Sequence, residues 1–169
     1  MDPFFAWVED GWLSVWIRSS DSILAFPGII VLHTLGMGFL AGINAVIDLR
    51  ILGVASRIPL ASLEKFFPVL WLSFAINVFS GVLLLVAYPT KALTNPVFYL
   101  KLLCIGVAVW LMQKIRGDVL RDPLANQMPS RRAKRLAIVS LALWLIGIAA
   151  GRLLAYTYTR LLVGDPVRF

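Results

Sequence analysis

The chain has 169 residues, 60% of them hydrophobic, and its mean hydropathy of +0.85 is well above that of a water-soluble domain. The apolar residues come in four long blocks, which leaves no room for a separate soluble domain and predicts one integral membrane domain over residues 1–169. The formal net charge of +7 is typical of a membrane protein with basic cytoplasmic loops, so we expect lipid and no nucleic acid as a partner.

The first expected element is an amphipathic helix over residues 3–19, which is too short and too charged to span a bilayer. Three aromatic and three polar side chains fall on opposite faces of this helix: Phe5, Trp12 and Trp16 against Asp10, Ser14 and Arg18. This pattern predicts a helix lying at the membrane interface, although Glu9 falls on the apolar side and fits poorly. Because the segment is acidic and lacks a basic start, we expect it not to be a cleaved signal.

Four membrane-spanning helices are expected over residues 22–47, 66–88, 96–114 and 136–158. Together they predict an all-α fold, a four-transmembrane-helix bundle. Pro27 lies close to the start of the first span, which kinks there or begins nearer Phe26.

Basic residues determine the expected orientation of the bundle. The first and third connections carry ten of the sixteen lysines and arginines: Arg50, Arg57 and Lys65, then Lys114, Arg116, Arg121, Arg131, Arg132, Lys134 and Arg135. The second connection carries only Lys91. The basic connections therefore belong on the cytoplasmic side, and both termini on the outer side.

Small residues at helical spacing indicate close helix packing. Gly38 and Gly42, Ala41 and Ala45, and Gly147 and Gly151 are each four residues apart. We expect these faces to pack inside the bundle, with dimerisation as the alternative.

The only histidine of the chain, His33, lies inside the first span on the same helical face as Met37, Asn44 and Asp48. Ionisable residues at membrane depth mark functional sites by default. The second span offers Asn77 between Ser73 and Ser80, and the fourth offers Arg152 and Tyr156. Lys101 lies about one turn inside the outer end of the third span.

A mid-membrane histidine below two cations is the layout that a b-type haem requires, with His33 as the axial metal ligand and Lys101 and Arg152 at the propionates. Asn77 and Tyr156 complete the candidate cofactor site, with Asn77 also able to bind a quinone together with His33. The alternatives are a purely structural His33 bonded to a carbonyl or to Asn77, a snorkelling Lys101, and a copper site of His33 and Met37.

Asp48 and Arg50 lie at the cytoplasmic end of the first span. We expect a local ion pair of Asp48 with Arg57 or Lys65, with a proton relay as the alternative. The lone Cys104 gives no disulfide or cysteine-pair metal site, and the chain has no second histidine, so the sequence does not support hydrolytic or nucleophilic chemistry.

The first span resembles a family of bacterial inner-membrane proteins of unknown function through Phe26-Pro27, His33, Gly36, Gly42, Asp48-Leu49-Arg50 and Leu52-Gly53. Further matches are Asn95-Pro96-Val97-Phe98, Lys101, Trp144, Gly151-Arg152 and Ala155-Tyr156. Ile30 stands where that family often has a glutamate. The resemblance implies a multi-pass protein of the bacterial inner membrane, which with the orientation above puts both termini in the periplasm.

A more distant likeness is to the membrane protoporphyrinogen oxidase and copper-resistance D-type families, in which an early histidine and a later lysine correspond to His33 and Lys101. This likeness implies haem binding. The sequence therefore predicts a small haem- or quinone-binding subunit that exchanges electrons with a periplasmic redox protein. The alternative is a cofactor-free accessory subunit of a larger membrane complex, and a transporter ranks last because no inverted repeat is visible.

Overall fold

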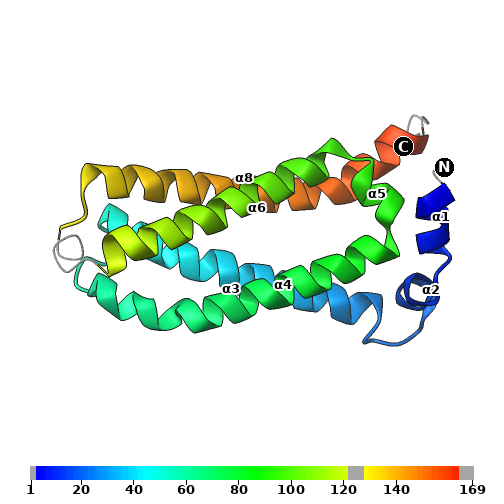
Figure 1. Cartoon of the computed structure of the whole chain (residues 1–169), viewed down its shortest axis with the longest axis horizontal. Helices are drawn as coiled ribbons and strands as arrows, with labels where there is room; N and C mark the ends of the chain where they lie inside the picture. Colours follow the sequence, from blue (N-terminus) through cyan, green and yellow to red (C-terminus); the bar gives the residue numbers. More distant parts are fainter. Residues whose placement is uncertain (1–2, 122–127, 164–169) are drawn as a thin grey trace, which may run out of the picture.

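A computed structural model describes residues 3–121 and 128–163, with the backbone alone for 155 and 157–163. The described chain is all-α, and four of its helical segments are long and apolar enough to cross a membrane (Figure 1). These are α3 (Phe26–Leu52), the 3-10 helix η1 (Leu60–Phe66) with α4 (Phe67–Ala87), α6 (Pro96–Ile115) with the π-helical η2 (Arg116–Leu120), and α8 (Arg131–Val163). This confirms the predicted all-α bundle of four apolar helices.

Helix α3 packs along α4, and α6 packs along α8, while α3 and α8 join the two pairs (Figure 1). The described part of both chain ends lies at one end of the bundle, together with α1 (Pro3–Glu9), α2 (Trp12–Ser19) and α5 (Pro89–Leu93). The first and third connections lie together at the opposite end, as the basic residues predict. We call these the terminal end and the basic end.

Proline and glycine determine where α3 begins and ends. Pro27 occupies its first turn, where a missing N–H costs least, so the helix begins at Phe26 and not near residue 22. Gly53 ends it with a φ of +107°, in the left-handed region that glycine adopts without strain, and its N–H bonds back to the Arg50 carbonyl.

The N-terminal segment is two short helices instead of the single helix expected over 3–19, because the chain breaks at Asp10 and Gly11. Ser14 and Ile17 of α2 are buried against the end of α4. The aromatic side chains point away from the bundle, and Trp12 is 80% exposed. Ser14 and Arg18 of the predicted polar face therefore contact the protein, whereas Asp10 is exposed. The exposed Trp12 and Trp16 are available to contact lipid.

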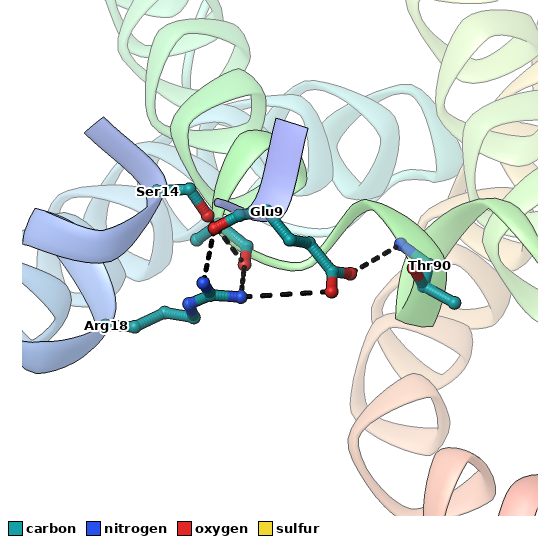
Figure 2. Close-up of polar contacts among 5 residues, drawn as sticks. Glu9, Ser14, Arg18 and Thr90 are labelled. Atoms are coloured by element: carbon teal, nitrogen blue, oxygen red, sulfur yellow. Dashed lines mark hydrogen bonds and ion pairs between the residues drawn. The ribbon is translucent and has the colours of Figure 1, made fainter. Parts of the chain in front are cut away.

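Polar contacts hold α1 and α2 to the terminal end (Figure 2). Arg18 donates to the Glu9 and Ala87 carbonyl oxygens, and Ser14 donates to the same Ala87 oxygen at 3.3 Å. The Glu9 carboxylate accepts from the Thr90 N–H at 3.2 Å. Glu9 falls on the apolar side of the predicted helix because its carboxylate bonds to the start of α5 and does not face water.

Glycines allow the helices of each pair to approach closely, though not all the predicted ones do so. A Cβ at Gly36 would lie 3.0 Å from the Ser73 carbonyl oxygen of α4, and Gly147 and Gly151 face side chains of α6. Gly38 and Gly42 are exposed with nothing within 4 Å, so the prediction that this pair packs inside the bundle is wrong. Gly38 lies about 200° around the helix from Gly36, on the side turned away from α4.

Candidate functional site

His33 lies where α3, α4 and α6 meet, in the half of the bundle nearer the terminal end. Its Nδ1 is 3.2 Å from the Asn77 carbonyl oxygen and 3.1 Å from the Ser80 hydroxyl, both on α4. Its Nε2 is 3.4 Å from the Lys101 Nζ on α6. The Asn77 side chain donates from Nδ2 to the His33 carbonyl oxygen at 2.9 Å. We call these four residues, His33, Asn77, Ser80 and Lys101, the histidine cluster.

The partners of His33 determine which ring nitrogen carries the proton. A carbonyl only accepts, and the Ser80 hydroxyl already donates to the Ile76 carbonyl oxygen at 2.7 Å, so Nδ1–H is the donor on this side of the ring. Nε2 is then left as an acceptor that faces the Lys101 amine. The imidazole is thus neutral, with both nitrogens bonded.

Two glycines bring the helices close enough for these bonds. A Cβ at Gly81 would lie 3.2 Å from the His33 Cε1, and one at Gly36 would lie 3.1 Å from the Asn77 backbone nitrogen. The Lys101 methylenes lie against Gly151 of α8, where a Cβ would stand 3.5 Å from Cε. A side chain at any of these glycines would crowd the histidine cluster.

The contact between His33 and Lys101 follows from where their helices begin. Because α3 begins at Phe26, His33 lies about 10 Å along its helix and not the 16 Å estimated from residue 22. Lys101 lies about 8 Å along α6, which begins at Pro96. The two side chains therefore lie at nearly the same distance from the terminal end. Lys101 points to His33 and not toward the membrane surface, so the snorkelling alternative does not describe its position.

The structure brings together three of the five predicted cofactor residues: His33, Asn77 and Lys101. Arg152 is exposed on α8, and Tyr156 is 63% exposed on the same helix. Sequence reasoning missed Gly81, whose position four residues after Asn77 is the one available signal.

A second polar cluster lies between α3 and α8, nearer the basic end. Asn44 Nδ2 donates to Asp48 Oδ2 at 2.6 Å and to the Ser140 hydroxyl at 2.9 Å. All three side chains are buried, and Asp48 is 0% exposed. We call them the aspartate cluster.

The expected ion pair of Asp48 with Arg57 or Lys65 is wrong. Asp48 points into the bundle toward Asn44, whereas both basic residues are exposed in the first connection. Arg50 turns to this connection instead, and donates to the Ile58 and Ser56 carbonyl oxygens at 2.5 and 2.8 Å.

Charged groups at the basic end tie the first connection to the third. Glu64 of η1 accepts from Arg121 at 2.7 Å and from Arg116 at 3.3 Å. The Arg116 guanidinium also lies 4.4 Å from the centre of the Phe67 ring. Glu64 is thus occupied by two arginines and does not turn toward the bundle interior.

No metal-binding group lies near His33 in the part of the chain that the structure describes. No three His, Cys, Asp or Glu side chains gather there in a way that could hold a metal ion. An apolar cavity of about 120 Å³ lies between α3 and η1, lined by Ile43, Val46, Ile47, Leu63 and Phe66. Small-molecule sites usually enclose about 300 Å³ or more, so this cavity is too small for a cofactor.

Comparison with family models, with curated proteins and with solved structures finds no match for this chain. The likeness of the first span to an inner-membrane family therefore stays a prediction. The structure and the sequence together make this an all-α protein with four candidate membrane-spanning helices.

Proposed function

We propose that this protein is a subunit of the bacterial inner membrane that binds a lipid-soluble quinone at the histidine cluster and exchanges electrons with a periplasmic redox protein. The contact of Lys101 Nζ with His33 Nε2 carries the proposal, because it places an amine and an imidazole side by side inside an apolar bundle. A quinone carbonyl accepts hydrogen bonds, and an amine is a strong donor. The redox protein supplies the electrons.

The position of the pair also supports this ligand class. His33 and Lys101 are both half-buried, in contrast to the fully buried aspartate cluster. Most exposed side chains around them on α3 and α6 are apolar, such as Val31 and Leu102, and suit contact with lipid tails. A ligand with an apolar tail and a carbonyl head matches that surface.

Haem fits the same residues less well. Iron bound at His33 Nε2 would have to displace Lys101, the residue predicted to hold a propionate, from this nitrogen. Arg152 and Tyr156, the other residues predicted to hold the cofactor, are exposed on α8. We therefore propose the quinone and not b-type haem as the ligand of this site.

A cofactor-free accessory subunit is the second candidate. Two bonds of the histidine cluster, from Asn77 to the His33 carbonyl and from His33 to the Asn77 carbonyl, join α3 to α4 without any ligand. In this case the exposed aromatic side chains of α1 and α2 are the surface for docking a larger membrane complex.

Quinone binding to the purified protein in lipid nanodiscs tests the proposal. Decylubiquinone is added stepwise, and quenching of the tryptophan fluorescence is followed. We expect saturable quenching for the wild type and at least about tenfold weaker binding for Lys101→Met, since one strong hydrogen bond is worth about 1.4 kcal/mol or more. Lys114→Met is the matched control, because this lysine lies on α6 beside exposed Asp118.

Non-saturable quenching that is equal in all variants would contradict the quinone site and favour the accessory subunit. Absorption spectra of the air-oxidised and dithionite-reduced protein, expressed with haem supplied, test the remaining alternative. A haem band that is lost in His33→Ala would overturn the preference for quinone.

A further inference from the structure

Asp48 has a carboxylate oxygen with no partner, deep inside the bundle. Its Oδ2 accepts from Asn44, whereas its Oδ1 is buried and has no hydrogen-bond partner among the described residues. The side chain as a whole is 0% exposed. A buried polar atom without a partner costs free energy, so this oxygen calls for a ligand.

Among the described residues, no positive side chain forms an ion pair with Asp48. On its own helix, Arg50 bonds to the Ile58 and Ser56 carbonyl oxygens. From α8 the neighbouring polar side chain is the neutral Ser140, which also accepts a hydrogen bond from Asn44. The neighbouring η1 carries Glu64, which two arginines occupy, and Lys65, which is exposed and lies 5.5 Å from the centre of the Phe66 ring. An ionised carboxylate in this apolar setting is strongly disfavoured unless a cation joins it.

The donors around Asp48 favour a proton over a metal ion. Asn44 turns its NH2 group toward both Asp48 and Ser140, so its amide repels a metal cation at this point. Asp48 Oδ1 is then the one carboxylate oxygen left, whereas Na⁺ or Ca²⁺ requires a shell of several oxygens. A proton requires only one.

We propose that the aspartate cluster is a proton-binding site, in which Asp48 holds an exchangeable proton on Oδ1 and Asn44 donates to Oδ2. Asp48 lies four residues before the end of α3 at Leu52, which puts it about 6 Å along the helix from the basic end. Its proton exchanges with that side of the membrane. The aspartate cluster is formed by α3 and α8. It lies about 22 Å along α3 from His33, so this proposal does not depend on the quinone site.

Infrared spectroscopy of the full chain in detergent at neutral pH tests the proposal. The difference spectrum of the wild type minus Asp48→Asn should contain the carbonyl stretch of a protonated carboxylic acid, and this band should shift down in D2O. Asp118→Asn is the control, because Asp118 is an exposed carboxylate beside Lys114 and should remove only carboxylate bands.

The proposal would be overturned if the Asp48→Asn difference spectrum contained carboxylate bands in place of the acid band. If those carboxylate bands changed with added NaCl, Asp48 would bind a metal cation instead of a proton. Ser140→Ala and Asn44→Ala keep the carboxyl and are the variants to use if Asp48→Asn does not fold. Asn44→Ala should shift the frequency of the acid band, because it removes the donor to Oδ2. An unchanged spectrum in Asn44→Ala would also count against the proposal.

Discussion

Helix α3 carries two polar clusters, fifteen residues apart, that differ in how their polar atoms are paired. In the histidine cluster both ring nitrogens of His33 have partners on other helices; His33 and Lys101 are half-buried, whereas Asn77 and Ser80 are buried. In the aspartate cluster the side chains are fully buried, and one oxygen of Asp48 lacks a partner. The two clusters therefore differ at one atom, the buried Oδ1 of Asp48, which has no counterpart around His33.

This difference separates two uses of a polar group in a membrane. A satisfied, half-buried pair can exchange a bond with the protein for a bond with a ligand that arrives from lipid. An unsatisfied, fully buried carboxyl is stable only with a cation on it. Substitutions that act on one cluster and leave the other unchanged test whether the two are independent.

The largest expected effect is at Gly36, which brings α4 close to the histidine cluster. Gly36→Ala should lower the free energy of unfolding by about 1–3 kcal/mol, because the added Cβ meets the backbone of Ser73 and Asn77. Gly38→Ala, two residues away with open space around it, should cause no loss. Unfolding in SDS with helicity as the readout measures both, and an equal loss in the two variants would contradict the close approach.

The next effect concerns the aspartate cluster. Asp48→Ala should cost about 1–2 kcal/mol, since Asn44, which is buried, loses its acceptor. Asp48→Asn has the shape of a protonated aspartate and should cost less than about 0.5 kcal/mol in the same unfolding experiment. If Asn proves as costly as Ala, the carboxyl is ionised in the folded protein, and the contrast between the clusters disappears.

Asn77→Ala should have a smaller effect, of about 1 kcal/mol, as is typical of a hydrogen bond between membrane helices. The variant removes the donor to the His33 carbonyl oxygen but no backbone contact. Ser73→Ala is the control, because the Ser73 hydroxyl bonds within its own helix to Val69 and should change stability little. Thermal unfolding measures the loss of stability in both variants. A larger loss in Asn77→Ala than in Ser73→Ala gives the contribution of the hydrogen bond between α3 and α4.

Composition predicted the helices well, because an apolar block of sufficient length has few alternatives to a membrane span. The stripe of His33, Asn44 and Asp48 on α3 also followed from helical spacing alone. Both clusters therefore contain residues that the sequence singles out.

What the sequence could not predict is which helix each face meets. Gly38 and Gly42 have the spacing of a packing motif, yet α4 contacts the Gly36 side of α3. The bond between Lys101 and His33 depends on α3 beginning at Phe26, so a shift of four residues changes which side chains are level. Asp48 was expected near basic loop residues because they are close in the chain, whereas its partner lies on the same helix and faces α8.

The smallest expected effect is at the terminal end, where α1 and α2 are held over the histidine cluster's half of the bundle. Arg18 is partly exposed, and its ion pair with Glu9 is long, at 4.0 Å. Arg18→Gln should therefore lower stability by less than about 1 kcal/mol, as exposed ion pairs usually do. Ser14→Ala removes the other bond to the Ala87 carbonyl and is the variant to combine with it.

The two changes together should loosen α1 and α2 without disturbing either cluster, because the bonds they remove join Ser14 and Arg18 to Ala87 and Glu9 at the terminal end (Figure 2). Cleavage by a protease at the break between α1 and α2 should then become faster, while decylubiquinone binding and the infrared band of Asp48 stay unchanged. A loss of quinone binding in the double variant would instead couple the terminal helices to the histidine cluster. The histidine cluster would then be a site that includes α1 and α2, whereas the aspartate cluster would not.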